Sequence, residues 1–243
     1  MTRKKITFLI AFVALFSIII IAFTNFKREG DERILSYTVD PKFNNIQLYW
    51  RNDKGSPFKS IEKLKSWLDS KNRSLLFATN GGMYNEDNIP KGLYIEKNAL
   101  LTPLDTTSGN GNFYLKPNGV FYVTNSKKNV ICKTSDFKLR SNILYATQSG
   151  PMLVINGEIH DSFKLGSTNL NIRNGVGVLP DGRVVFNMSK EPINFYNFAK
   201  YFKDLGCKNA LYLDGFVSRT YLPEQKWVQT DGDFGVIIGV IPN

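Results

Sequence analysis

The sequence has a single histidine and only two cysteines among its 243 residues. His160, Cys132 and Cys207 are too few to supply the four Cys/His ligands of a structural zinc site, which excludes that class of protein. A Ser-His-Asp triad is disfavoured because no nucleophile-elbow pattern surrounds a serine, and we expect His160 to lie at the surface. Sequence alone cannot establish whether the two cysteines pair.

The sequence also lacks any block of Lys or Arg, although Lys+Arg number 31 against 21 Asp+Glu, for a net charge of +10. Scattered basic residues are typical of a solvated cationic surface, and they argue against a nucleic-acid-binding arm. We therefore expect no nucleic-acid partner. A cationic, exported body would suit an anionic polymer, such as a phosphate-bearing glycan of the cell envelope.

Long apolar runs are absent except at the N-terminus, where Ile6 to Phe23 carry no charge. That length is near the minimum for a membrane-spanning helix. Bulky residues follow it where a signal peptidase needs small ones, which favours an uncleaved signal anchor. We expect residues 1–26 to form this transmembrane segment and residues 27–33 a short stalk. The N-terminus would then be cytoplasmic and the body extracytoplasmic, in the periplasm or at the cell surface.

The body, residues 34–243, contains no linker and is expected to be one domain of the α+β class. The pattern predicts a mixed, mostly antiparallel sheet built from hairpins, covered by two amphipathic helices. One helix is predicted to start at Ser56-Pro57-Phe58, and its apolar residues recur every three or four positions up to Leu68. The second is predicted from Pro192 to Leu205, with Gly206 as its stop.

Asn-Gly and Asp-Gly dipeptides between apolar runs are strong hairpin signals. They predict three hairpins, which turn at Pro117-Asn118-Gly119, Asn156-Gly157 and Pro180-Asp181-Gly182. The expected strand pairs are Phe113–Leu115 with Val120–Val123, Met152–Ile155 with Glu158–His160, and Val176–Leu179 with Val184–Asn187. Further strands are expected at Ile34–Val39, Ile46–Trp50, Leu75–Ala78, Ala210–Leu213 and Gly235–Ile241.

Four loops gather polar residues directly after apolar strands, where a rigid scaffold can hold functional groups. Their glycines allow the backbone to approach a ligand closely. The loops are Asn80-Gly81-Gly82-Met83-Tyr84-Asn85-Glu86-Asp87 with Lys91-Gly92, Gln148-Ser149-Gly150-Pro151, Asn171-Ile172-Arg173-Asn174-Gly175-Val176-Gly177, and Asp214-Gly215-Phe216-Val217-Ser218-Arg219.

These four blocks, in this order between Leu75 and Val240, resemble the phosphodiester glycosidase domain family. That family includes N-acetylglucosamine-1-phosphodiester alpha-N-acetylglucosaminidase, and the chain looks closest to its short bacterial branch. One feature departs from the mammalian-like branch, which has several glycines after the aspartate where this chain has Phe216-Val217. The resemblance implies hydrolysis at a sugar anomeric carbon with a phosphate monoester as the leaving group.

The resemblance also implies roles for individual residues. Arg173 is expected to hold the phosphate, because a guanidinium meets phosphate through two parallel donors. Lys91 would assist as a point charge. Asp214 is the expected catalytic carboxylate, which either activates water or stabilises positive charge on the sugar ring, and Glu86 (or Asp87) is the candidate for a second carboxylate.

The remaining candidates are groups that would bind sugar hydroxyls or phosphate oxygens. They are Asn80, Gly81, Gly82, Ser149, Gly150, Gly215 and Ser218. No cofactor is required, although the polar cluster at residues 80–87 could hold Ca²⁺. Two alternatives stay open: Arg173 could form a structural ion pair with Asp214, and the body could be a non-catalytic domain that binds an anionic glycan.

Overall fold

A computed structural model describes residues 31–243 of the chain, and residues Arg33–Asn243 form one compact unit. The predicted signal anchor and most of the predicted stalk lie outside the described residues. Within the described part, no helix has both the length and the apolar character needed to span a membrane.

Three antiparallel sheets make up the unit, which confirms the predicted α+β class. The first contains β1 (Ile34–Val39), β12 (Val184–Ser189), β11 (Asn174–Val178), β13 (Asn209–Tyr212), β9 (Met152–Ile155) and β10 (Glu158–Ile159), in that spatial order. The second contains β15 (Trp227–Val228), β14 (Thr220–Leu222), β3 (Phe77–Asn80), β16 (Ile237–Pro242) and β2 (Asn44–Tyr49). The third contains β5 (Ala99–Thr102), β4 (Tyr94–Glu96), β8 (Ile143–Ser149), β6 (Gly119–Thr124) and β7 (Asn129–Lys133).

The largest hydrophobic cluster joins all three sheets. Phe186 of β12 stacks on Phe77 of β3 with ring centres 5.1 Å apart, and it meets Phe121 of β6 edge-on at 6.2 Å. All three rings are almost completely buried. Burial of a side chain of this size stabilises the fold by about 1.5 to 3 kcal/mol, so this contact fixes how the sheets meet.

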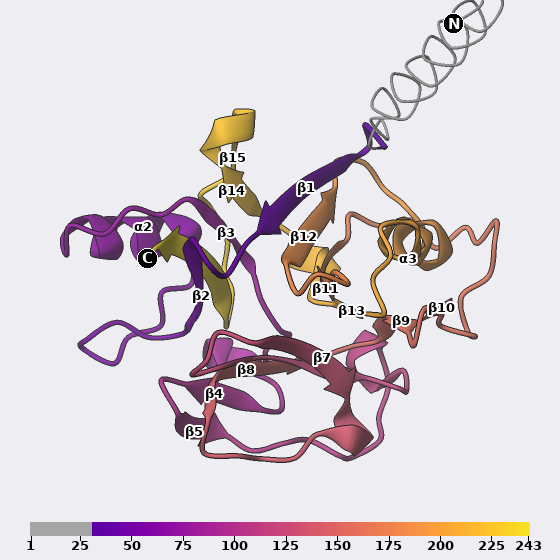
Figure 1. Cartoon of the computed structure of the whole chain (residues 1–243), viewed down its shortest axis with the longest axis horizontal. Helices are drawn as coiled ribbons and strands as arrows, with labels where there is room; N and C mark the ends of the chain where they lie inside the picture. The colour runs from indigo at the N-terminus through magenta and orange to yellow at the C-terminus, as the bar shows by residue number, and fades with distance from the viewer. Residues whose placement is uncertain (1–30) are drawn as a thin grey trace, which may run out of the picture. The chain divides into compact units, whose positions relative to one another are not determined.

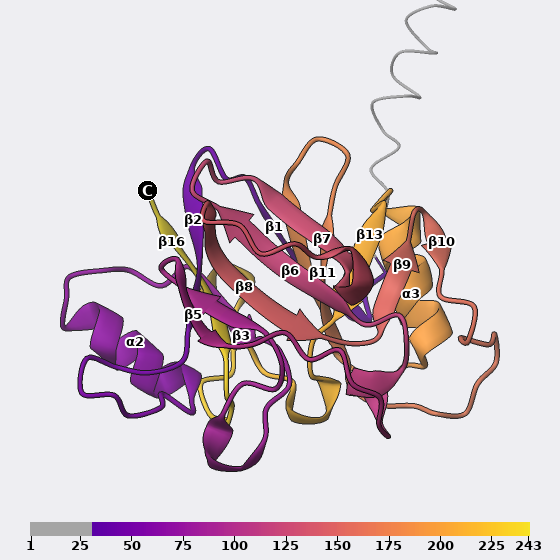
Figure 2. The ribbon, with the colours of Figure 1, turned by 90° about the horizontal axis from the view of Figure 1, so that it is seen from below.

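Two amphipathic helices cover the sheets, as predicted, but both begin later than expected (Figures 1 and 2). α2 (Ile61–Asp69) starts after Ser60, whose hydroxyl caps Lys63, and not after Ser56. It packs on β2 and β16. α3 (Phe195–Asp204) starts after Asn194, whose side chain caps Asn197, and it packs on β9 and β13. In both helices the N-cap is the polar residue directly before the first helical residue, and its side chain accepts a hydrogen bond from the backbone N–H three positions later.

Two of the three predicted hairpins are present and one is wrong. β9 pairs with β10 across Asn156-Gly157, and β11 pairs with β12 across Pro180-Asp181-Gly182. The turn at residues 117–119 joins no hairpin, because Phe113 lies in the 3-10 helix η2 (Asn112–Tyr114) and β6 pairs with β7 and β8 instead. Asn118 Nδ2 donates to the carbonyl of Phe113 at 3.0 Å, which holds this segment in its non-strand path.

The rare side chains also occupy defined positions. His160 is 4% exposed and not at the surface, contrary to our expectation. Its Nε2 lies 3.0 Å from the carbonyl oxygen of Lys116, and its ring stacks on Phe163 at 4.8 Å. Cys132 and Cys207 are free thiols.

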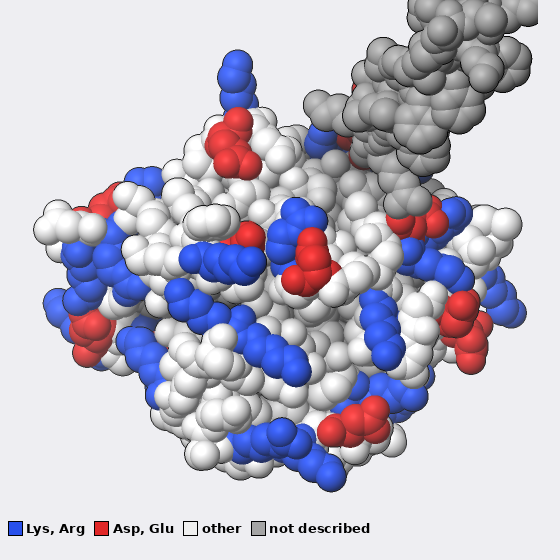
Figure 3. All heavy atoms as spheres, in the orientation of Figure 1, with Lys and Arg blue, Asp and Glu red and all other residues white. Residues whose placement is uncertain are grey.

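The charged side chains are spread over the surface. On the face shown in Figure 3, Lys and Arg stand at many separate points, with fewer Asp and Glu between them. Several are in exposed ion pairs, such as that of Lys200 with Asp204 on α3. Pairs of this kind contribute about 1 kcal/mol or less each, so the net charge mainly sets what the surface attracts.

Candidate active site

The four polar loops predicted from the sequence meet in one place. Asn80, at the end of β3, donates through Nδ2 to the carbonyl of Asp214 at 2.7 Å. The hydroxyl of Ser149, at the end of β8, donates to the carbonyl of Leu213 at 2.6 Å. Asn174, at the start of β11, accepts from the N–H of Asp214 at 3.0 Å. Three strands from three sheets therefore fix the backbone on which Asp214 is mounted.

Asn174 is the centre of this network and is completely buried. Its Nδ2 lies 3.1 Å from Thr79 Oγ1 and 3.0 Å from both the carbonyl and Oδ1 of Asn80. The same Asn80 Oδ1 also accepts from the N–H of Arg219 at 3.0 Å. Asn174 was not predicted to be a functional residue, although its place inside the Arg-Asn-Gly block was an available signal.

Asp214 is half-buried and lies two residues after the end of β13. Burial raises its pKa from 3.8 to about 6, and a hydrogen bond from the N–H of Phe216 opposes that rise. Among the described residues it has no ion-pair partner. A carboxyl group with this pKa can exchange a proton close to neutral pH.

Gly215 makes the turn after Asp214 possible. A Cβ at this position would collide with the hydroxyl of Tyr212 and would lie 2.6 Å from the carbonyl of Ile172. Its N–H donates to the hydroxyl of Tyr212 at 2.8 Å. The glycine therefore lets the chain close tightly over Tyr212.

Arg173 lies beneath the same turn, where it is 1% exposed. Its Nε donates to the carbonyl of Ile193 at 2.8 Å, and Nη2 donates to the carbonyl and Oδ1 of Asn169 at 3.0 and 3.2 Å. Its Cζ lies 3.5 Å from the ring centre of Phe195 and 5.7 Å from that of Tyr212. Burial lowers its pKa from the ordinary value. No ion pair joins it to Asp214 in the described chain, and the phosphate clamp stays a prediction.

Lys91 lies beside the first loop and is half-buried. Its N–H donates to the carbonyl of Met83 at 2.8 Å. Its ammonium lies 4.5 Å from the ring centre of Tyr114 and 5.1 Å from that of Phe113, which are cation–π distances. The rings hold the charge without neutralising it.

The other predicted ligand-binding groups lie in the supporting network. The N–H of Gly81 donates to the carbonyl of Val236, and the hydroxyl of Ser218 is 3.5 Å from the carbonyl of Asp214. A Cβ at Gly82 would lie 2.6 Å from the carbonyl of Gln148, and one at Gly150 would lie 2.6 Å from Asn118 Cβ. These residues allow close packing around Asp214, and their contact with a ligand stays a prediction.

Glu86 and Asp87 lie in the 3-10 helix η1 (Glu86–Asn88) and are exposed. With Tyr84 they border an open hollow of about 780 Å³. Burial, followed by the charge of Asp214, raises the pKa of Tyr84, so Tyr84 is close enough to Asp214 for that charge to act on it. No group of three Asp, Glu, His or Cys side chains gathers anywhere in residues 31–243, and Ca²⁺ binding at residues 80–87 stays a prediction.

Comparisons with known proteins identify the family of the chain. The family model for phosphodiester glycosidase matches residues 73–236. The chain is 38% identical over 190 residues to the uncharacterized protein YigE of Escherichia coli (strain K12), covering 78% of this chain and 74% of that protein.

Solved structures share the fold at lower identity. The zebrafish N-acetylglucosamine-1-phosphodiester alpha-N-acetylglucosaminidase catalytic domain superimposes with a TM-score of 0.58 at 16% identity, covering 88% of this chain and 85% of that one. A putative exported protein of Burkholderia pseudomallei gives a TM-score of 0.56 at 10% identity, covering 86% and 74%.

Proposed function

The chain belongs to the phosphodiester glycosidase family, and we propose that it hydrolyses the bond between a sugar anomeric carbon and a phosphodiester. We propose that the substrate is an anionic glycan of the cell envelope. In this proposal residues 1–26 anchor the protein in the membrane and the body acts outside the cytoplasm. The scattered positive charge of the body suits such a polymer.

The chemistry needs little from a general acid. A phosphate monoester leaves far more readily than a sugar alkoxide. The main requirements are therefore a cation near the phosphate and a protein carboxylate that acts at the anomeric carbon. Asp214 supplies the carboxylate in this proposal. It either activates a water molecule or stabilises positive charge on the ring, as carboxylates do in other glycosidases.

The cation is divided between two residues in this proposal. Lys91 keeps its ammonium over Tyr114 and Phe113 without a carboxylate partner in the described chain, so it can meet a phosphate directly. Arg173 is enclosed by Asn169 and Ile193 and acts through its field unless Asn169 moves aside. Glu86 stays the candidate for a second carboxylate.

The observation that carries this proposal is the position of Asp214. Its backbone is fixed on both sides, by Asn174 at the N–H and by Asn80 at the carbonyl, while its carboxylate has no cationic partner among the described residues. A structural acid would be expected to have such a partner, because an unpaired charge is costly to bury. The rival proposal, a non-catalytic glycan-binding domain, needs no carboxylate held in this way.

Asp214→Asn separates the two proposals. The side chain keeps its shape but loses its charge, so we expect hydrolysis of a nitrophenyl-phosphate sugar diester to fall by about 10²- to 10⁴-fold while binding of the diester persists. The matched control is Asp69→Asn, which removes an exposed carboxylate on α2. A wild-type protein that binds the diester panel and turns over none of it would establish the binding domain instead.

A further inference from the structure

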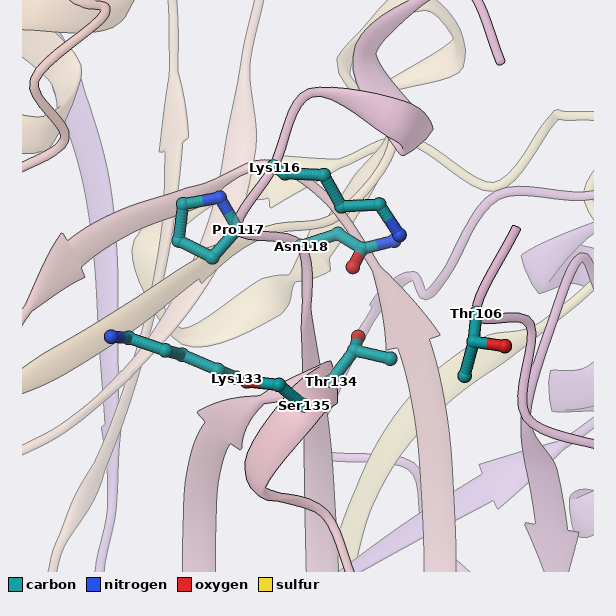
Figure 4. Close-up of a pocket in the computed structure, with 7 residues that line it drawn as sticks. All are labelled: Thr106, Lys116, Pro117, Asn118, Lys133, Thr134 and Ser135. Carbon is teal, nitrogen blue, oxygen red and sulfur yellow. The ribbon is translucent and has the colours of Figure 1, made fainter. Parts of the chain in front are cut away.

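Two polar regions of the described chain differ in how firmly their groups are held. Beside the turn before β6 lies a cavity of about 470 Å³, where Lys116 and Lys133 extend away from each other (Figure 4). Long lysine side chains that diverge in this way set no single geometry for a ligand. Around Asp214, by contrast, short hydrogen bonds fix the backbone, and one of them ends on the hydroxyl of a buried tyrosine, Tyr212.

The peptide group between Asp214 and Gly215 is hydrogen-bonded at both of its polar atoms. Its carbonyl accepts from Asn80 Nδ2 at 2.7 Å, and its N–H donates to the hydroxyl of Tyr212 at 2.8 Å. The preceding N–H, that of Asp214 itself, donates to Asn174 Oδ1 at 3.0 Å. Because a peptide group is planar and rigid, these three bonds fix the backbone on both sides of the Asp214 Cα, and with it the direction of the Cα–Cβ bond.

Tyr212 is itself held firmly. It is the last residue of β13 and is 2% exposed. The ring of Phe195 meets its ring edge-on with centres 4.9 Å apart, and Cζ of Arg173 lies 5.7 Å from its centre. Its backbone N–H donates to the carbonyl of Pro151 at 3.1 Å. A closely packed ring cannot change rotamer without displacing its neighbours, so the hydroxyl stays at the N–H of Gly215.

We propose that Tyr212 is a positioning residue for Asp214, whose side chain it keeps in one orientation by holding the N–H of Gly215. The tyrosine is too deeply buried to touch a substrate, so it acts through the turn. Without the hydroxyl, the buried N–H of Gly215 would lack its acceptor, which is unfavourable, and the turn would be free to rotate. The effect of that rotation on catalysis rests on the proposed function, whereas its effect on Asp214 does not.

The titration of Asp214 reports on the same turn. Burial raises the pKa of Asp214 to about 6, and the N–H of Phe216, the residue after Gly215, opposes that rise. Tyr84 and Tyr212 are close enough for the charge of Asp214 to act on them, but both have raised pKa values and stay neutral near pH 6. A rotated turn would admit water to the carboxyl group and remove both effects. Because burial is the larger of the two, we expect the pKa of Asp214 to fall toward the ordinary 3.8.

Tyr212→Phe, made in the full-length chain, tests the proposal because it removes only the hydroxyl. ¹³C NMR of labelled aspartate carboxyl groups follows the titration, and Asp214→Asn identifies the Asp214 signal by its loss. We expect the midpoint to move from about pH 6 in the wild type to roughly pH 5 or below in the variant. With a nitrophenyl-phosphate sugar diester, kcat should fall by roughly 10- to 100-fold while KM changes by less than about 2-fold, since Tyr212 touches no substrate.

Tyr49→Phe is the matched control. Tyr49, on β2, is 3% exposed, and its hydroxyl donates to Gln47 Oε1 at 2.8 Å, so this variant also deletes one well-packed hydroxyl. It should leave the Asp214 midpoint and kcat as they are in the wild type. Equal effects of the two variants would make Tyr212 an ordinary core residue and overturn the proposal, as would an unchanged midpoint in Tyr212→Phe, or an unchanged kcat in an active enzyme. A shifted midpoint in a protein that cleaves no diester would refute the proposed function and leave the positioning role standing.

Hydrogen exchange in the wild type decides the question if Tyr212→Phe does not fold. The N–H of Gly215 should exchange at least roughly 10²-fold more slowly than an unprotected amide, because Tyr212 holds it. Exchange of this N–H at the unprotected rate would show that the hydroxyl does not hold the turn, and the proposal would be wrong.

Discussion

Arg173 and Asp214 both lie close enough to Tyr212 for their charges to act on its pKa, yet their surroundings differ completely. The guanidinium is 1% exposed, donates to two carbonyls and one side-chain oxygen, and packs on Phe195. The carboxylate is half-buried, receives one N–H from Phe216 and has no cation beside it in the described chain. The guanidinium is enclosed by protein partners at Nε and Nη2, whereas the carboxylate is held in place with a single N–H donor.

This difference in hydrogen bonding helps to distinguish residues that support the fold from residues that could bind a ligand. A buried polar group with all its hydrogen bonds made contributes to a unique fold and cannot easily serve a ligand as well. A ligand gains most binding free energy from a group that is fixed by the protein but still has unused hydrogen-bonding capacity, because the protein has already ordered that group. On that criterion we propose Asp214 and Lys91 as the reactive groups, while Asn174 and Asn80 hold the backbone of Asp214 in place.

The largest expected effect comes from Arg173. Arg173→Met keeps much of the volume but leaves the carbonyls of Ile193 and Asn169 without a donor, so we expect the free energy of unfolding to fall by about 3 kcal/mol or more. Arg173→Lys should recover only part of it, because one ammonium cannot replace the fork of donors. Chemical denaturation would measure both changes.

Arg140→Met is the matched control for that experiment, because Arg140 is exposed and its loss should leave stability within about 0.5 kcal/mol. The conclusion that Arg173 is a structural residue would be wrong if Arg173→Lys unfolds at the same denaturant concentration as the wild type while KM for the diester rises about 10-fold. That result would show a guanidinium that meets the phosphate, as the sequence alone suggested.

Local elements of the structure could be predicted well from the sequence. β1 spans Ile34–Val39 as predicted, and the Asn156-Gly157 hairpin forms between the expected strands. Both depend on neighbouring residues, whose turn chemistry and alternation can be read directly. The four polar loops were also identified from the sequence, but only the structure shows that they meet in one place.

What the sequence concealed depends on contacts between distant residues. Asn174 binds groups 94 and 95 positions away, so no local pattern marks it as the centre of the network. The segment around Phe113 looked like a strand, but its path is set by Asn118 and by packing against Gly92. The enclosure of Arg173 required α3 to bring Phe195 over it.

The next effect in size is a pH dependence of Asp214. The pKa of Asp214 is about 6 in the folded state, above the ordinary 3.8. The folded state therefore binds this proton more tightly, and its contribution to stability is lost as pH rises from about 4 through 6. Asp214→Asn should be more stable than the wild type at pH 8, by between about 1 and 3 kcal/mol, and equally stable near pH 3.5. Denaturation at the two pH values measures this.

Activity should follow the opposite course with pH. If the carboxylate is the active form, kcat/KM of the wild type rises as Asp214 ionises around pH 6 and levels off above it. Asp69→Asn, the exposed control, should change neither profile. A wild-type rate that falls as pH rises through 6 would make Asp214 the proton donor, and a stability difference independent of pH would remove its raised pKa altogether.

The smallest expected effect tests the rim of the site, where Phe216 is 92% exposed two residues from Asp214. Its N–H donates to the Asp214 carboxylate, so the backbone of Phe216 is fixed beside that carboxylate. Stacking on a sugar face is worth about 0.5 to 1.5 kcal/mol, and Phe216→Ala should raise KM by roughly 3- to 10-fold with kcat and stability unchanged. Phe216→Trp should restore KM. Phe43, 69% exposed before β2, is the matched control, and equal effects of the two alanine variants would show that Phe216 is an ordinary surface residue.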